Sequence, residues 1–246
     1  MPRPNYTVFE DKTQLSQHAA HSFLSGVASA ARHNQLYRVA LAGGSTPALL
    51  YRLLTDLPTR EEINWNYVQL FFGDERCVPP ESPDSNFHMV TDSLLSRLGS
   101  RKPQIFRMEG ELDPEEGALR YEETLRREFG IDAGEVPRFD LILLGMGSDG
   151  HTASLFPHQE SLNVTDRLVV AAEPGLKPFV PRLTLTYPVL NNAAEVLFLV
   201  AGEDKAETVK LVFDGDYLPE TLPSQAVKPI HGTLTWLLDK AAASAI

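Results

Sequence analysis

Phe139–His151, FDLILLGMGSDGH, joins a short apolar run to a loop that holds three glycines, an aspartate and a histidine. An apolar run of this length is typical of a strand that is buried on both faces. Such strands build the mostly parallel sheets of α/β proteins, which bind ligands beyond the carboxyl ends of their strands. The stretch therefore predicts a fold class and, in the loop that follows the run, the place of a functional site.

Apolar runs and helical segments alternate along the rest of the chain. Thr46 and Pro47 are expected to be the N-cap and the first residue of one helix. Alternation of this kind predicts a mostly parallel sheet with helices on both faces. The other predicted strands are Tyr37–Ala42, Tyr67–Gly73, Arg167–Ala172 and Glu195–Ala201, and the predicted helices are Asp11–His33, Thr46–Leu54, Asn86–Leu98, one that starts at Asp113-Pro114, and Asp204–Phe213.

Composition excludes several classes of protein. The 246 residues include 33 Asp and Glu against 22 Lys and Arg, a net charge of −11, which disfavours a nucleic-acid partner. The single cysteine, Cys77, can form neither a disulfide within the chain nor a cysteine-based metal site. Met1–Glu10 lacks the layout of a signal peptide, and no apolar run approaches the roughly 18–20 residues of a membrane span. We expect a cytoplasmic protein with no membrane partner, folded as one domain over residues 1–246; the sequence gives no oligomeric state.

Four polar, glycine-bearing segments each directly follow an apolar run. Because the carboxyl ends of parallel strands meet at one edge of the sheet, these segments are expected to lie together there. They are Gly43–Thr46, Gly73–Arg76, Gly145–His151 and Gly202–Lys205.

The first segment has the features of an anion site. Gly43 and Gly44 allow the backbone to approach a ligand, Ser45 and Thr46 carry hydroxyls, and the next helix presents free N–H groups. Together these groups favour phosphate binding. The alternative is a tight turn between a strand and a helix with an ordinary cap.

The third segment is the candidate for chemistry. Histidine transfers protons near neutral pH, and His151 follows Asp149 by two residues, so the carboxylate could fix its tautomer. No G-x-S-x-G elbow is present, which favours a water activated by His151 over a serine nucleophile. The alternative is a histidine that only caps the next helix.

Cations complete the candidate site. Arg76 could pair with an oxyanion or a phosphate, although local ion pairs of a solvated loop would also explain it. Arg182 is a further candidate, and Lys205 opposes a helix dipole unless an anion lies between them. Lys177 is a weaker candidate, and for Cys77 an inert, half-buried thiol is favoured over a reactive one. No His, Asp and Glu set has metal-ligand spacing, so neither a metal nor another cofactor is expected.

Taken together, these motifs resemble the 6-phosphogluconolactonase family. The resemblance runs from about residue 40 to the region of Trp236, and its long central motif is the most specific part. The motifs are GGSTP at 43–47, GDER at 73–76 with Ser85-Asn86, GMGSDGHTASLFP at 145–157, RLTLT at 182–186, VAGEDK at 200–205 and PSQAV at 223–227.

This resemblance implies a Rossmann-like, doubly wound α/β fold and the hydrolysis of 6-phosphoglucono-δ-lactone in the pentose phosphate pathway, without a metal or other cofactor. It implies that His151 is the general base, with Asp149 beside it, and that Arg76 contacts the substrate. It assigns the phosphate of the sugar-phosphate lactone to residues 43–46, Arg182 and Lys205.

Two rival functions stay open at this point. Glucosamine-6-phosphate deaminases are similar, but they typically continue with Ile-Ala-Phe-Asn-Glu after the histidine, where this chain has Thr152–Pro157. They also have Asp-Glu-Tyr where this chain has Asp74-Glu75-Arg76. A sensor that binds a sugar phosphate without turnover would be expected to have lost His151 or Asp149.

Overall fold

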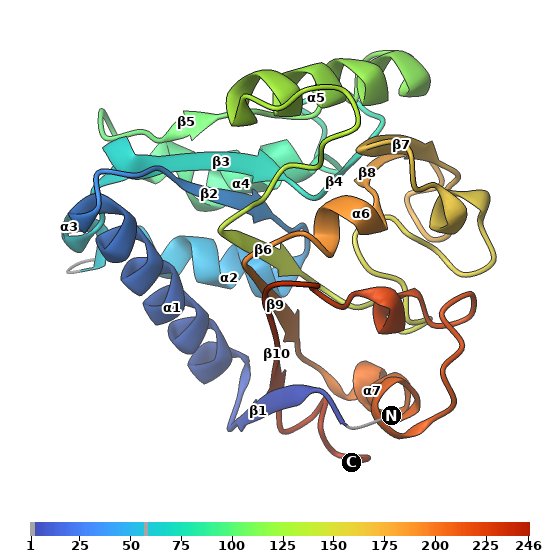
Figure 1. Ribbon diagram of the computed structural model, residues 1–246. Helices are drawn as coiled ribbons and strands as arrows, with labels where there is room; N and C mark the ends of the chain where they lie inside the picture. The colour runs from blue at the N-terminus through green and yellow to red at the C-terminus, as the bar shows by residue number, and fades with distance from the viewer. Residues whose placement is uncertain (1–2, 57–58) are drawn as a thin grey trace.

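The computed structural model describes residues 3–56 and 59–246, and its centre is a sheet of seven parallel strands (Figure 1). All six neighbouring pairs of strands run parallel. In spatial order the strands are β1 (Asn5–Phe9), β10 (Thr233–Asp239), β9 (Glu195–Val200), β6 (Leu141–Leu144), β2 (Tyr37–Leu41), β3 (Val68–Phe72) and β5 (Gln104–Ile105).

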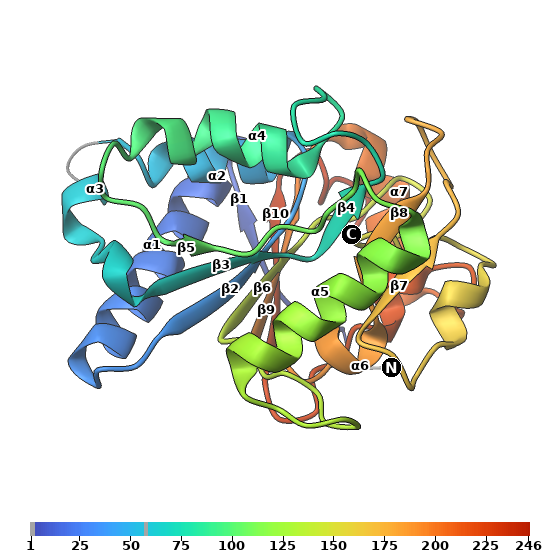
Figure 2. The ribbon, with the colours of Figure 1, turned by 90° about the horizontal axis from the view of Figure 1, so that it is seen from above.

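Helices cover both faces of this sheet, as Figures 1 and 2 show. α1, α2 and α4 lie on one face, and α5 and α7 lie on the other, so the expected doubly wound α/β fold is confirmed. Within the described residues, none of the helices is both long enough and apolar enough to cross a membrane. The helices are α1 (Lys12–Arg32), α2 (Ser45–Leu53), α3 (Thr59–Glu62), α4 (Asn86–Ser93), α5 (Pro114–Phe129), α6 (Tyr187–Leu190) and α7 (Ala206–Asp214), and the 3-10 turns are η1 (Trp65–Tyr67), η2 (Leu95–Arg97), η3 (Glu160–Asn163), η4 (Glu203–Lys205) and η5 (Pro223–Ala226).

A second, antiparallel sheet of three strands stands beyond the carboxyl end of β3. Its order is β4 (Asp74–Arg76), β8 (Arg182–Leu185) and β7 (Val169–Ala172). The strand expected at Arg167–Ala172 is therefore present as β7, but it belongs to this small sheet. β4 follows β3 after one residue, Gly73, which brings the small sheet directly to the ligand-binding edge of the large one.

The central strands of the large sheet are almost entirely buried, and β3 and β6 are buried at every position. Every residue of β6 is buried, and Phe71 of β3 stacks on Phe106 with ring centroids 4.7 Å apart. On the other side of the sheet centre, Trp236 of β10 stacks on Phe198 of β9 at 3.8 Å. Burial on both faces explains why the sequences of these strands are nearly continuous runs of apolar residues.

Local signals place most helix ends. Asp113 caps α5 by accepting from the N–H groups of Glu115 and Glu116, Pro114 is the first helical residue, and Gly130 ends the helix in the left-handed conformation at φ 63°. Acidic residues near the start of α5 and arginines near its end match the helix dipole.

The start of α2 differs from the prediction. The N-cap is Gly44, at φ 99°, and it makes no side-chain cap hydrogen bond, so Thr46 and Pro47 already lie within the first turn. The expected cap at Thr46 was therefore wrong. The helix expected at Asn86–Leu98 is also shorter, because α4 ends at Ser93 and the 3-10 turn η2 follows.

Glu122 joins α5 to the small sheet. Its carboxylate is nearly buried and accepts from Nε of Arg167 at 2.9 Å and from the N–H groups of Leu168 and Val169 at 2.6 and 3.1 Å. These bonds fix the position of β7 relative to α5.

We expect Glu122→Ala to lower the free energy of unfolding by about 1–3 kcal/mol, because the change leaves two buried backbone N–H groups without an acceptor. Arg167 contributes less, since it is partly exposed and its Nη1 also lies 3.8 Å from Oε2 of Glu115. Urea denaturation measures this loss. Glu123→Ala is the matched control, since Glu123 is the exposed neighbour on the same helix. Equal losses in the two variants would contradict the assigned role of Glu122.

Candidate active site

A cavity of about 240 Å³ lies at the carboxyl ends of β2, β3 and β6. β2 and β6 are neighbours, and the chain order reverses between them, so this is the switch point where doubly wound sheets bind ligands. All four segments expected at this edge contribute to the cavity. Its lining residues are Ala42, Gly43, Gly44, Gly73, Asp74, Arg76, Asn86, Leu143, Leu144, Gly145, Met146, Gly147, His151, Ala153 and Lys205.

His151 lines this cavity and forms a close pair with Asp149, which is not itself a lining residue. Nδ1 of His151 lies 2.5 Å from Oδ1 of Asp149, and the same oxygen accepts the backbone N–H of His151 at 3.1 Å. Burial opposes ionisation of Asp149, but its hydrogen bond to His151 and the charge of that imidazole hold the pKa of Asp149 below its usual value. An ionised Asp149 keeps the proton on Nδ1, which leaves Nε2 as the basic nitrogen.

The loop around this pair is held by its own hydrogen bonds. The N–H of Gly147 donates to the carbonyl of His151 at 2.9 Å, and Oγ1 of Thr152 donates to the carbonyl of Gly145 at 2.9 Å. Phe156 packs against the imidazole, with ring centroids 4.5 Å apart. A Cβ on Gly147 would overlap Nδ1 of His151 and approach Oδ1 of Asp149, so glycine is required there.

The glycine loop after β2 reaches the cavity through its backbone. Gly43 and Gly44 line the cavity, whereas Ser45 and Thr46 are not among the lining residues. Oγ of Ser45 accepts a hydrogen bond from Nζ of Lys12 at 2.9 Å. Lys12 was not predicted from the sequence. The available signal was a cation in the first turn of a helix, where it opposes the helix dipole.

Glu75 organises the segment that carries Arg76. Its buried carboxylate accepts the N–H groups of Arg76, Asn86 and Phe87 and the hydroxyl of Ser85 at 2.6–3.0 Å. Burial raises the pKa of Glu75, although each of these hydrogen bonds opposes that shift. Arg76 donates from Nη1 to the carbonyl of Asp84 at 2.6 Å and lines the cavity.

A second polar group, missed from the sequence, lies beside Glu75. Nδ2 of Asn86 donates to the carbonyl and to Oδ1 of Asp74, at 2.9 and 3.1 Å, and Oγ of Ser154 donates to Oδ2 of Asp74 at 2.7 Å. Oδ1 of Asn86 is buried and has no partner among the described residues. Ser85-Asn86 was noted only as part of a family motif; nothing in its spacing predicts that Asn86 reaches the cavity.

The candidate phosphate cations lie in different settings. Lys205 lines the cavity, and its Nζ pairs with Oδ2 of Asp204 at 3.0 Å. Arg182 stands opposite Arg76 in the β4–β8 pair, so both side chains project from the same face of the small sheet. Arg182 is not a lining residue; Nη2 bonds to the carbonyls of Leu176 and Pro178, while Nε and Nη1 are buried without a partner in the described chain. Burial and then the charge of Arg76 lower the pKa of Arg182.

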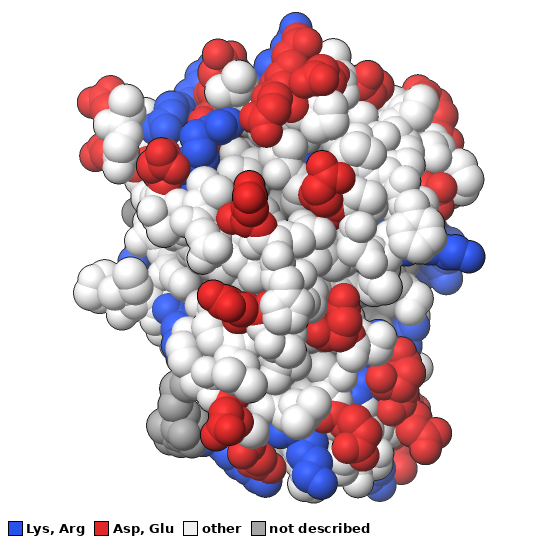
Figure 3. All heavy atoms as spheres, turned by 90° about the vertical axis from the view of Figure 1, so that its right-hand side faces the viewer, with Lys and Arg blue, Asp and Glu red and all other residues white. Residues whose placement is uncertain are grey.

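Part of the acidic surplus of the chain is visible on one face of the molecule. On the face at the right of Figure 1, Asp and Glu side chains occupy the centre and Lys and Arg lie mainly toward the rim (Figure 3). The cations of the candidate site thus belong to a protein with 33 acidic against 22 basic residues.

Cys77 and Lys177 remain outside the cavity lining. Burial raises the pKa of Cys77 to about 11, against the opposing charge of Arg182, so the thiol is neutral at physiological pH. This supports the interpretation of Cys77 as an inert thiol. Lys177 is exposed in the loop before β8. Residues 3–56 and 59–246 contain no group of three or more His, Cys, Asp and Glu side chains that could hold a metal ion.

Fold and cavity together define the class: a doubly wound α/β protein whose switch-point cavity combines a glycine-rich loop, cationic side chains and a His–Asp pair. The model of the family described as glucosamine-6-phosphate isomerases/6-phosphogluconolactonase matches residues 10–236. This chain belongs to that family.

Individual relatives agree with this membership. The 6-phosphogluconolactonase of Synechocystis sp. is 39% identical over 240 residues, which cover 97% of each chain. The solved structure of 6-phosphogluconolactonase from Trypanosoma cruzi matches with a TM-score of 0.86 at 28% identity, over 99% of this chain and 97% of that one. A monomeric glucosamine-6-phosphate deaminase matches with a TM-score of 0.79 at 25% identity, over 98% of this chain and 100% of the other.

We expect Gly147→Ala to separate His151 from Asp149 and to cost about 1–3 kcal/mol of stability, because the added methyl group has no free volume. Proton NMR of the wild type should show a downfield imidazole N–H resonance from the Nδ1–Asp149 hydrogen bond, and the variant should lose it. Gly145→Ala is the matched control, since a Cβ there meets nothing within 4 Å. Persistence of the resonance in Gly147→Ala would show that the overlap is relieved without breaking the pair.

Proposed function

We propose that this protein hydrolyses 6-phospho-D-glucono-1,5-lactone to 6-phospho-D-gluconate, the lactonase step of the oxidative pentose phosphate pathway. One observation carries the proposal: the His151–Asp149 pair opens on a cavity that also presents the Gly43–Gly44 backbone, Arg76 and Lys205. A base, an anion site and cations for a developing negative charge are what lactone hydrolysis requires. Family membership and the named relatives support the same activity.

We further propose that residues 1–246 act as a single domain of a cytoplasmic enzyme. The cavity takes residues from segments between Ala42 and Lys205, so both halves of the large sheet contribute to one site. A chain with one cysteine is suited to a reducing compartment.

In the proposed mechanism, Nε2 of His151 takes a proton from a water molecule as that water attacks the lactone carbonyl carbon. Asp149 stabilises the imidazolium that forms and holds its orientation. Arg76 is assigned to the tetrahedral oxyanion, because it lines the cavity and its guanidinium is held by the carbonyl of Asp84. The bond from the carbonyl carbon to the ring oxygen then breaks, and His151 returns the proton to that oxygen.

The substrate phosphate is assigned to the glycine loop after β2 and to two cations, Lys205 and Arg182. The backbone of Gly43 and Gly44 and the first turn at Ser45 and Thr46 supply N–H groups, since α2 has no side-chain cap. Lys205 contributes a charge at the lining. Arg182 is assigned to the same anion, because it stands beside Arg76 and has two buried donors without partners, an arrangement that an anion would stabilise.

Deamination of glucosamine 6-phosphate is the alternative activity within the family. Residues after His151 favour the lactonase, because Thr152 bonds to the backbone and Phe156 packs on the imidazole, and neither brings a carboxylate to the ring. The two activities separate in one assay series: proton release from freshly generated 6-phosphogluconolactone against ammonia release from glucosamine 6-phosphate.

We expect His151→Ala to lower kcat for the lactone by roughly 10²–10⁴-fold, the usual effect of a positioned acid–base group. Proton release from freshly generated lactone measures the rate, corrected for spontaneous hydrolysis. Thermal unfolding close to that of the wild type would show that the variant is folded. Turnover near the wild-type rate in a folded His151→Ala protein would remove His151 from the mechanism.

We expect Lys205→Ala and Arg182→Ala each to lower kcat/KM for the phosphorylated lactone by roughly 10- to 150-fold, the loss of one charged contact to phosphate. The informative control is a second substrate, the lactone without phosphate. Each variant should lose most of the preference for the phosphorylated lactone and change little on the plain one. A residue whose replacement slows both lactones equally would belong near the carbonyl.

A further inference from the structure

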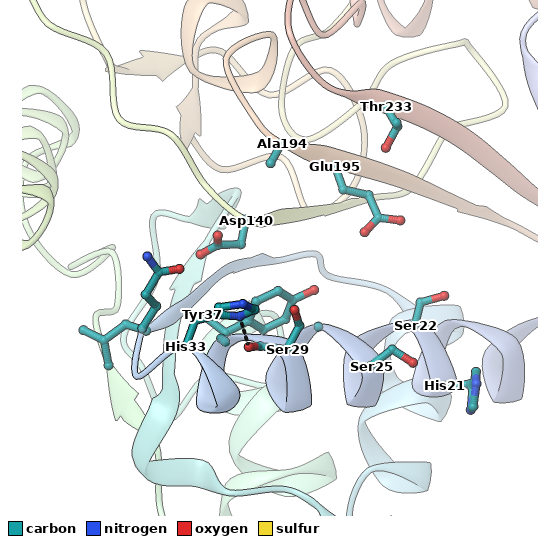
Figure 4. Close-up of a pocket in the computed structure, with 14 residues that line it drawn as sticks. His21, Ser22, Ser25, Ser29, His33, Tyr37, Asp140, Ala194, Glu195 and Thr233 are labelled. Atoms are coloured by element: carbon teal, nitrogen blue, oxygen red, sulfur yellow. Dashed lines mark hydrogen bonds between the residues drawn. The ribbon is translucent and has the colours of Figure 1, made fainter.

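A groove of about 540 Å³ lies at the other end of the large sheet from the candidate active site. It runs between α1 and the amino ends of β2, β6, β9 and β10 (Figure 4). A strand of five residues spans roughly 17 Å, so a ligand in this groove would be well separated from the cavity at the carboxyl ends.

Tyr37 is the best-buried polar side chain that lines the groove. Its residue is 6% exposed, and its ring packs edge-on against Phe23 at 5.8 Å. The ring lies directly over Gly26 of α1, where any Cβ would overlap it. Its hydroxyl has no hydrogen-bond partner in the described structure and opens on the groove, where it can accept or donate a hydrogen bond.

Two half-buried carboxylates face Tyr37 from the sheet. Glu195 begins β9, and Asp140 directly precedes β6. Burial raises the pKa of Tyr37, and the negative charges of Glu195 and Asp140 raise it further, so both carboxylates act on its hydroxyl. Burial also raises the pKa of Glu195 and that of Asp140.

The two carboxylates differ in their surroundings. Asp140 accepts the backbone N–H of Arg38 at 2.7 Å, and the charges of Arg38 and Arg138 oppose the rise in its pKa. The side chain of Glu195 makes no hydrogen bond or ion pair within the described residues, and burial alone raises its pKa. No lysine or arginine lines the groove. The half-buried charge of Glu195, which has no counter-charge, would be stabilised by a cation in the groove between it and Asp140.

Helix α1 supplies the opposite side of the groove. In Figure 4, Ser22 and Ser25 lie on α1 across the groove from Glu195, and Ser29 lies beside Tyr37. These hydroxyls can accept N–H groups, and they extend the polar surface along several turns of the helix. A metal ion does not fit, since the described residues include no set of three or more metal-ligand side chains.

We propose that this groove binds a small aliphatic diamine or polyamine, with its ammonium groups between Asp140 and Glu195 and one N–H donated to the hydroxyl of Tyr37. The extended, hydroxyl-lined shape suits a flexible chain that carries several N–H donors, and the two carboxylates supply the charge. The site goes beyond the proposed hydrolysis and does not depend on it, because it shares no residue with the cavity at the carboxyl ends.

Calorimetric titration with spermidine at low ionic strength tests the proposal. We expect saturable binding to the wild type, and Glu195→Gln should weaken it by roughly tenfold or more, because the variant loses a charge-assisted contact. Tyr37→Phe keeps the ring packing and should weaken binding severalfold. Triethylene glycol, a neutral chain of similar length, should give no saturable binding.

Glu123→Gln is the matched control, because it removes the same charge from an exposed position on α5. Its titration should match that of the wild type within twofold. The proposal is overturned if wild-type binding is not saturable, or if Glu123→Gln weakens it as much as Glu195→Gln. Thermal unfolding of each variant shows that it is folded, and Glu195→Gln is the cleanest change because the side chain makes no bond to the described protein.

Discussion

The carboxylate of Glu75 is the interaction on which the candidate active site depends. It gathers donors from two elements, β4 and the start of α4, and thereby fixes the backbone that carries Arg76, Asn86 and the neighbouring Asp74. A buried carboxylate is unfavourable unless donors surround it, and four donors do so here. The direction in which Arg76 projects therefore depends on a side chain that does not line the cavity.

Strand order supplies the second constraint. The order of the strands reverses between the neighbours β2 and β6, so the chain leaves these two strands in different directions and a space opens between the loops that follow them. The His–Asp loop comes from one side of that space and the glycine loop from the other. Each proposed role takes residues from both halves of the sheet, since Arg76 follows β3 on the side of the glycine loop and Lys205 follows β9 on the side of His151.

Central parts of this arrangement could be predicted from the sequence, because they depend on local composition. Runs such as residues 139–145 are apolar since both faces are buried, and glycines follow them since the backbone must turn close to a ligand. The edge strand β1 could not be found in this way, because its residues are mostly exposed or partly exposed and its sequence NYTVF mixes polar with apolar side chains. β4 is three residues long and charged, so only its partner β8 makes it a strand.

Side-chain contacts were predictable only where sequence separation is small. Asp149 and His151 are two residues apart, and the turn between them places the pair. The contacts of Asp74 with Ser154 and of Lys12 with Ser45 join segments that are distant in sequence, and no local pattern encodes them. The N-cap of α2 is Gly44, not Thr46, because the turn into the helix requires a residue at φ 99°. Thr46 therefore lies within the helix.

The missing cap of α2 has a consequence for the stability of the protein. Serine, threonine, aspartate or asparagine at this position would typically stabilise the helix by about 1 kcal/mol relative to an uncapped start. With Gly44 as the N-cap, α2 lacks part of that stabilisation, and the amides of its first turn have no side-chain acceptor and can bind a ligand. An anion bound there would complete the helix end, so occupancy of the cavity should also raise the resistance of the protein to unfolding. Folding and substrate recognition thus rely on the same few amide groups, and the protein is most stable when an anion is bound to them.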